Sequence, residues 1–144
     1  MTVAAILKHK GSRVETVRPN ATVQQVSNLL AENRIGATVV VGAAGEVVGV
    51  VSERDLVHAL AKHGGAALNR AVDEIMTRDV ETCRLTDTSE ALMEQMTRGR
   101  FRHLPVVEGG RLIGIISIGD VVKRRIEDSE LERRSMHSYI AQAG

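Results

Sequence analysis

The stretch GVVSERDLV at residues 49–57 has a counterpart in GIISIGDVV at residues 114–122, and this pair decides which fold to expect. Each stretch begins with a glycine, passes through two apolar residues to a serine, and reaches an aspartate three positions after that serine. The variable pair between serine and aspartate is Glu-Arg in the first stretch and Ile-Gly in the second. A pattern this long, written twice in one chain, indicates an internal repeat.

The correspondence extends upstream of both stretches. RVETVRPNAT at 13–22 matches DVETCRLTDT at 79–88, and RIGATVVV at 34–41 matches RFRHLPVV at 100–107. All the matches occur in one order, at offsets of 65 or 66 residues. The chain is therefore predicted to contain two copies of one unit and a tail, with bounds at 6–65, 72–127 and 128–144.

Hydrophobic periodicity assigns the same elements to each copy. Apolar residues at helical spacing predict one helix with Thr22 as its N-cap and a matching helix in the second copy. Short β-branched runs bounded by turn residues predict buried strands. Each copy should follow the order strand, helix, strand, strand, helix, with elements at 14–17, 21–34, 37–41, 46–52 and 55–63, and again at 80–83, 87–100, 103–107, 111–117 and 120–128.

A unit of this size buries too little surface to be securely stable alone. We therefore expect an α/β fold in which two β-α-β-β-α repeats pack sheet against sheet with pseudo-two-fold symmetry, leaving two clefts between the copies. ALNRAVDEIM at 67–76 joins the copies, and its end, VDEIM at 72–76, is similar to the opening VAAIL at 3–7.

The composition is that of a globular protein with an aliphatic core. Apolar residues make up 43% and charged residues 26% of the 144 residues, and the formal net charge is only +1. So small a charge offers no field to recruit nucleic acid or an anionic membrane. The two aromatic residues, Phe101 and Tyr139, cannot supply the stacking platforms that single strands require.

Several classes of protein are disfavoured by what the sequence lacks. No apolar run approaches the length of a membrane span, and no secretory signal is recognisable, so we expect a cytoplasmic location. Cys83 is the only cysteine, which leaves no intrachain disulfide and no cysteine pair for zinc. No metal is expected. No P-loop or catalytic-triad spacing is found either, so an enzyme is disfavoured.

Ser52-x-x-Asp55 and Ser117-x-x-Asp120 each lie where a predicted strand meets a helix. One interpretation is structural: a serine at the N-cap and an acidic residue at N3 form a capping box. A cap alone does not call for a glycine before the serine or for a matching upstream strand. A binding role therefore stays open beside the structural one.

These features together resemble the CBS domain, the small repeat named after cystathionine β-synthase. Its pattern is a strand with glycine, two apolar residues and Ser or Thr, then two variable residues and Asp, preceded by a strand like LPVV. HLPVVEGGRLIGIISIGD at 103–120 follows this pattern closely, whereas ATVVVGAAGEVVGVVSERD at 37–55 has Val39 in place of the proline. The resemblance covers residues 6 to 127. The sequence also resembles stand-alone proteins that consist of a CBS pair.

The resemblance implies that the pair binds an adenine nucleotide: AMP, ADP, ATP, S-adenosylmethionine or NAD(H). Asp55 and Asp120 would each accept hydrogen bonds from both ribose hydroxyls. The helix N-terminus beside each serine suits phosphate, and main-chain groups of the strands would contact adenine. The candidate ligand-binding residues are Thr16, Gly36, Ala37, Val39, Ser52, Arg54, Asp55, Thr82, Arg100, Arg102, His103, Leu104, Pro105, Ser117, Ile118 and Asp120.

The two sites are expected to be unequal. The first copy offers Arg54, whose planar guanidinium suits phosphate. The second copy has an uncharged variable pair, and its cations lie instead on the approach to LPVV: Arg100, Arg102 and His103. The first copy has Gly36 and Ala37 in the places of Arg102 and His103. For each of these charges, a solvated surface position is the alternative.

Three functions are compatible with these features. The preferred one is a regulatory module that binds adenosine nucleotides and acts on an unidentified protein in trans. A structural dimerisation domain with empty clefts is the main alternative, and an enzyme is the third. A homodimer is expected, because the charged tail keeps a set of apolar residues: Ile126, Leu131, Met136, Tyr139 and Ile140.

Overall fold

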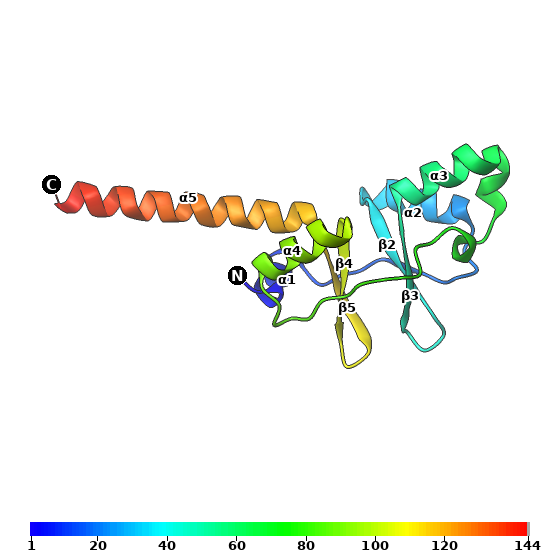
Figure 1. Cartoon of the computed structure of the whole chain (residues 1–144), viewed down its shortest axis with the longest axis horizontal. Coiled ribbons are helices and arrows are strands. Elements are labelled where there is room, and N and C mark those ends of the chain that lie inside the picture. The colour runs from blue at the N-terminus through cyan, green and yellow to red at the C-terminus, as the bar shows by residue number, and fades with distance from the viewer. Residues whose placement is uncertain (144) are drawn as a thin grey trace.

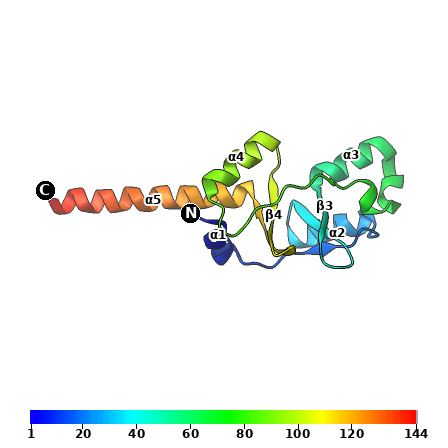
Figure 2. The same cartoon turned by 60° about the horizontal axis from the view of Figure 1, so that its bottom comes forward.

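The computed structural model describes residues 1–143, and the side chains of all of these except 139 and 141–143. Two lobes lie side by side, and a long helix projects from one of them (Figure 1). The turned view in Figure 2 shows the same arrangement, with this helix pointing away from both lobes. Gly144 and the Tyr139 side chain, which belong to the predicted tail, lie outside the described residues.

The first lobe follows the predicted order of elements. β1 (Thr16–Val17) pairs in parallel with β2 (Ala37–Val41), which pairs antiparallel with β3 (Val47–Ser52). The helices of this lobe are α2 (Val23–Asn33) and α3 (Glu53–His63), followed by the short 3-10 helices η1 (Gly64–Asn69) and η2 (Val72–Glu74).

The predicted cap of α2 is confirmed. The Thr22 hydroxyl accepts a hydrogen bond from the Gln25 N–H at 3.1 Å, and the Gln25 side chain accepts one from the Thr22 N–H at 2.9 Å. This reciprocal capping box satisfies N–H groups that a helix start leaves without partners.

The second lobe repeats the arrangement with one difference. It contains α4 (Ser89–Gly99), the antiparallel pair β4 (His103–Glu108) and β5 (Arg111–Ser117), and α5 (Ile118–Ala143). The strand predicted at 80–83 is reduced to a single parallel bridge between Cys83 and Val106. Pairing of the preceding residue with Pro105 would need an N–H at position 105, which proline lacks. Val39 has that N–H, so the first lobe forms two such pairs, Thr16 with Val39 and Val17 with Val40.

The opening helix α1 (Val3–Lys10) packs on the second lobe rather than the first. The Val3 N–H donates to the Asp87 carbonyl at 2.8 Å, and Val3 and Ile6 are buried in one core with Leu92. In the same way, Val72 is buried in the core of the first lobe. The segments VAAIL and VDEIM are thus equivalent: each stands at the start of one copy and closes the core of the lobe that the other copy forms.

This crossing explains the glycine of the repeated motif. A methyl group at Gly49 would collide with the Met76 side chain and lie 3.0 Å from the Thr77 carbonyl oxygen. A methyl group at Gly114 would lie 2.9 Å from both terminal carbons of Leu7. Carbon atoms pack at about 3.5–4.0 Å. The glycine is therefore required by the segment that lies on each return strand, and its presence is no argument for a ligand.

α5 is 26 residues long and leaves the lobe after its first turns (Figure 1). Val121 is fully buried, whereas the apolar side chains farther along the helix are exposed: Val122, Ile126, Leu131, Met136 and Ile140. In the part of the chain that the structure describes, no helix combines the length and apolar character that a bilayer span requires.

Candidate functional site

Two clefts lie between the halves of the chain, and the first is built around Ser52 and Asp55. It encloses about 580 Å³, within the range of small-molecule sites. One wall is the start of α3, and the other is the extended segment 77–81 together with the turn at 99–103. Its other lining residues include Gly36, Val50, Glu53, Arg54, Asp79, Val80, Glu81, Arg100, Phe101, Arg102 and His103. Three arginines and four carboxylates thus line this cleft.

The second cleft is built around Ser117 and Asp120 and encloses about 450 Å³. Its opposite wall comes from the end of α1, the extended segment 13–15 and the residues that join α2 to β2. Its other lining residues include Lys10, Arg13, Glu15, Asn33, Arg34, Gly36, Ala37, Thr38, His103 and Ile115. Two carboxylates line this cleft together with one lysine and two arginines, so its net charge is more positive than that of the first cleft.

Both Ser-x-x-Asp motifs make the hydrogen bonds of a helix cap. The Asp55 carboxylate accepts from the Ser52 N–H at 2.8 Å and from the Ser52 hydroxyl at 3.1 Å. The Asp120 carboxylate accepts from the Ser117 N–H at 2.8 Å, and the Ser117 hydroxyl accepts from the Asp120 N–H at 3.1 Å. The capping interpretation is therefore confirmed, and because both aspartates also line clefts, it does not exclude a binding role.

The two helix starts are anchored in the same way. The Glu53 N–H donates to the Gly36 carbonyl at 3.0 Å, and the Ile118 N–H donates to the Arg102 carbonyl at 2.8 Å. Each bond ties the first residue of a helix to the residue just before β2 or β4, the first strand of the antiparallel pair in its own lobe. The serine and aspartate of each motif are held firmly at the edge of their cleft as a result.

The two aspartates differ in their cationic partners. Lys10 Nζ lies 2.5 Å from Asp120 Oδ2 and 2.8 Å from the Ile115 carbonyl oxygen. Among the described residues, no lysine or arginine nitrogen lies within 4 Å of the Asp55 carboxylate. Burial raises the pKa of Asp120, but the Lys10 ammonium and the Ser117 N–H outweigh burial and hold this pKa below its ordinary value.

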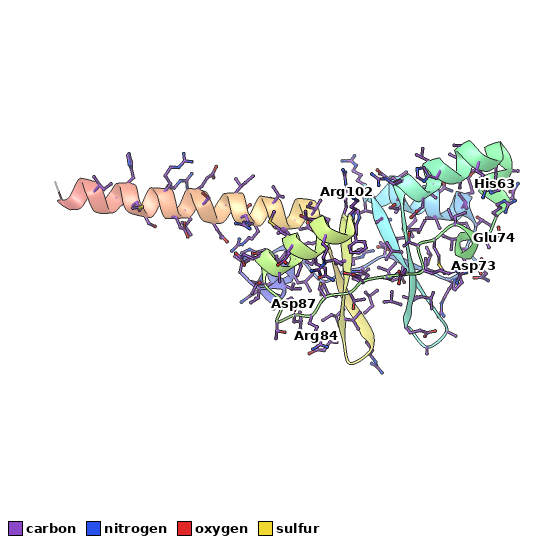
Figure 3. All side chains as sticks on the ribbon, in the orientation of Figure 1. His63, Asp73, Glu74, Arg84, Asp87 and Arg102 are labelled. Carbon is purple, nitrogen blue, oxygen red and sulfur yellow. The ribbon has the colours of Figure 1, made fainter. Side chains whose placement is uncertain are left out.

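One grouping made from the sequence is wrong. Arg100 and Arg102 were assigned to the site of the second motif because they precede LPVV in the same copy. They line the first cleft instead, opposite Ser52 and Asp55, and Figure 3 shows Arg102 between the two lobes. The reason is that each cleft combines the motif of one copy with the upstream segment of the other.

His103 and Gly36 form a wall that both clefts share. A methyl group added at Gly36 would lie 3.8 Å from the imidazole ring of His103. Burial lowers the pKa of His103, and the Lys10 charge adds to this effect; Asp120 and Glu53 oppose it, and Arg102 makes the smallest contribution, which also lowers the pKa. The imidazole between the clefts therefore favours its neutral form.

Several predicted site residues do not line either cleft. The side chains of Val39, Leu104 and Pro105 are buried in the lobes, so they could offer a ligand only main-chain atoms. The Pro105 carbonyl already accepts a hydrogen bond from the Cys83 N–H at 2.9 Å. Ile118 packs against the core of the second lobe, while Thr16 and Thr82 are exposed and lie outside both linings. The remaining predicted residues all line a cleft.

Arg34 lines the second cleft and was missed by the sequence analysis. It matches Arg100 at the repeat offset of 66 residues, and this alignment could have identified it. Both arginines follow a helix and adopt a left-handed conformation, with φ of 53° and 59°. This conformation costs a residue other than glycine roughly 1–2 kcal/mol. The same strained geometry thus presents one arginine to each cleft. Lys10, Asp79 and Glu81 were also missed, because nothing local marks them as cleft residues.

The described residues support neither a metal site nor a reactive thiol. Among the residues that the structure describes, no three His, Cys, Asp or Glu side chains gather as a metal site. Burial, aided by the negative charge of Asp87, raises the pKa of the Cys83 thiol to about 12. A buried thiol with so high a pKa is a packing group rather than a nucleophile.

Two β-α-β-β-α repeats with a pair of clefts between them define a tandem-repeat α/β module. The chain belongs to the CBS domain family, whose model matches residues 6–62 and 72–127. The resemblance and the fold class predicted from the sequence are confirmed by this match.

Known relatives include both sequences and solved structures. The chain is 29% identical over 147 aligned residues to the CBS domain-containing protein CBSX3, mitochondrial, of Arabidopsis thaliana, across 96% of this chain and 71% of that protein. The crystal structure of the CBS-domain containing protein ATU1752 from Agrobacterium tumefaciens is 49% identical with a TM-score of 0.83, covering 86% of this chain and 92% of that chain.

A more distant structure is the CBS domain pair of protein MJ0100, which is in complex with 5′-methylthioadenosine and S-adenosyl-L-methionine. It is 23% identical with a TM-score of 0.80, and the match covers 89% of this chain and 98% of that chain. At this level of identity, the likeness shows a shared fold.

Proposed function

We propose that this protein is a regulatory module that binds adenosine-containing nucleotides, AMP, ADP, ATP or NAD(H), in its two clefts. The observation that carries the proposal is the position of Asp55 and Asp120. Each carboxylate lies on a cleft, at the start of a helix and opposite arginines from the other repeat. A carboxylate can accept both hydroxyls of a ribose, and arginine suits phosphate.

The fold itself supports this class of ligand. The CBS pair of MJ0100 has the same fold and holds two adenosine compounds. The volumes of the present clefts suit ligands of that size. The module would act on an unidentified protein in trans, and a cytoplasmic location stays a prediction.

The first experiment is mass spectrometry of the small molecules released when purified protein is denatured. We expect an adenosine nucleotide. AMP, ATP and NADH are then titrated by calorimetry into the wild type, Asp55→Asn and Asp120→Asn. Comparing the three proteins assigns each measured affinity to one cleft. Asparagine keeps a side-chain oxygen that can accept from the serine N–H, so the helix starts should survive the change.

Each single variant should lose affinity in one cleft by roughly ten- to a hundredfold, the value of a hydrogen bond to a charged group. The other cleft should keep its affinity. Full binding by the double variant would reduce both motifs to ordinary capping boxes. Turnover of ATP or NAD would favour an enzyme, and a loss of affinity in EDTA would reveal a metal that accompanies a polyphosphate.

A homodimer is part of the proposal. Val122, Ile126, Met136 and Ile140 fall on one face of α5 at helical spacing, and they are between 40% and 68% exposed. An apolar stripe of this kind is usually covered in solution. We expect sedimentation to give twice the 15.6 kDa chain mass, and Ile126→Glu to shift the protein toward monomer. Leu131→Glu, on the opposite side of α5, is the matched control.

The same stripe favours the second candidate, a dimerisation module with empty clefts. A dimer that releases no nucleotide and binds none in titration would support it over the sensor.

A further inference from the structure

The contact between Lys10 and Asp120 joins two helices that are far apart in the sequence. Lys10 ends α1, and Asp120 lies in the first turn of α5, 110 residues later. The Lys10 side chain is 32% exposed and that of Asp120 is 24% exposed, so the pair is only partly open to solvent. A second bond to the Ile115 carbonyl fixes the ammonium in the second cleft.

The first cleft has no equivalent of Lys10. The matching segments VAAIL and VDEIM are followed by six residues in the first copy, KHKGSR, but by only three in the second, TRD, before the shared VET. Counted from those segments, the residue in the place of Lys10 is Asp79, which lines the first cleft. A cation in one cleft is thus replaced by an anion in the other.

This difference bears on any ribose that approaches Asp120. Its hydroxyls must compete with an ammonium that already makes a charge-assisted hydrogen bond to the same carboxylate. An uncharged nucleoside offers displaced Lys10 no counter-charge, whereas a phosphate in the same cleft does. At Asp55 no such competition exists.

We infer that Lys10 is the specificity residue of the second cleft: it makes binding there depend on a phosphate group of the ligand, so that this cleft takes phosphorylated nucleosides and disfavours uncharged adenosine. The inference rests on the proposed function. It adds that the first cleft, where four carboxylates lie and no described lysine or arginine pairs with Asp55, accepts adenosine more readily.

The test compares AMP with adenosine by calorimetric titration in the Asp55→Asn background, where only the second cleft is intact. Lys10→Met removes the ammonium and keeps the length of the side chain. We expect the affinity for adenosine to rise about tenfold, because the competing charged bond is gone. The affinity for AMP should stay level or fall, so the AMP preference should shrink by tenfold or more.

Two matched variants make the test specific. Arg13 lines the same cleft but pairs with Glu15 at 3.0 Å rather than with Asp120, so Arg13→Met should not raise adenosine affinity. Lys10→Arg keeps the charge and should keep the AMP preference, whereas Lys10→Gln removes the charge and replaces the methionine variant if that one does not fold.

A gain of adenosine binding separates this role from a simple phosphate contact, which would lower AMP affinity and leave adenosine unchanged. That second pattern, or an unchanged preference in Lys10→Met, would overturn the inference while leaving the proposed function intact. If wild-type protein binds neither AMP nor adenosine in either cleft, the proposed function fails and this inference fails with it.

Discussion

The two clefts carry one motif but different chemistry. In the first, the carboxylate of Asp55 accepts from its own serine and from no other described residue, and four carboxylates outnumber three arginines. In the second, Lys10 holds Asp120 and cations outnumber carboxylates. The difference arises because the motif comes from one copy and the opposite wall from the other. A repeated motif therefore predicts repeated local geometry, but not repeated selectivity.

The strongest test of the comparison asks whether the lobes are one folding unit. Leu30 and Met96 occupy equivalent positions on α2 and α4 and are 4% and 1% exposed. Truncation to alanine at either position should lower the free energy of unfolding by about 2–5 kcal/mol. The start of each copy packs in the lobe of the other copy: α1 lies in the core of the second lobe, and residues 72–76 lie in the core of the first. Each variant should therefore unfold in a single transition. Two separate transitions in denaturant or by calorimetry would show that the lobes are independent.

The two motif glycines should differ in how much a substitution by alanine destabilises the protein, and this effect is smaller than that of the core truncations. Gly49→Ala places a methyl group against the Met76 side chain and the Thr77 carbonyl, which is backbone and cannot turn aside. Gly114→Ala meets only the flexible end of Leu7. We expect Gly49→Ala to lower the free energy of unfolding by about 1–3 kcal/mol, the usual cost of overpacking, and Gly114→Ala to cost less. Equal losses in denaturant titration would mean that the backbone contact does not matter.

Arg102 tests the corrected assignment of the arginines. If Arg102 serves the first cleft, Arg102→Gln should weaken AMP binding there by about tenfold, or about 1.4 kcal/mol, while the second cleft is unaffected. Titration in the Asp120→Asn background isolates the first cleft. Arg98→Gln, an exposed change on α4 outside both linings, is the control. An effect confined to the second cleft would restore the assignment made from sequence.

The smallest expected effect concerns the shared wall. The pKa of His103 is lower in the folded chain than its ordinary value of 6.5. The neutral imidazole therefore contributes stability above about pH 6.5, and this contribution is lost as the pH falls toward the folded pKa. The free energy of unfolding should decline over that range in the wild type and decline less in His103→Gln. Parallel curves for the two proteins would show that His103 does not titrate in this way.

Much of this protein could be predicted from its sequence because the signals are local. Helical periodicity, the Thr22 cap and the two Ser-x-x-Asp caps depend on residues within a few positions of one another, and the caps are found where they were expected. The helix predicted at 120–128 and the tail predicted after it differ from expectation, because they form one continuous helix, Ile118–Ala143. The internal repeat and its resemblance to CBS domains then predicted the fold.

What only the tertiary structure decided is which surfaces face one another. No local signal shows that α1 closes the far lobe, that Arg102 lies opposite Asp55, or that Lys10 reaches a carboxylate 110 residues away. Even the motif glycine owes its place to a segment that crosses from the other half, and the short strand at 80–83 is limited by a proline on the neighbouring strand. Local hydrogen bonds and periodicity are set by neighbours in sequence, whereas the character of each cleft is set by packing between distant segments.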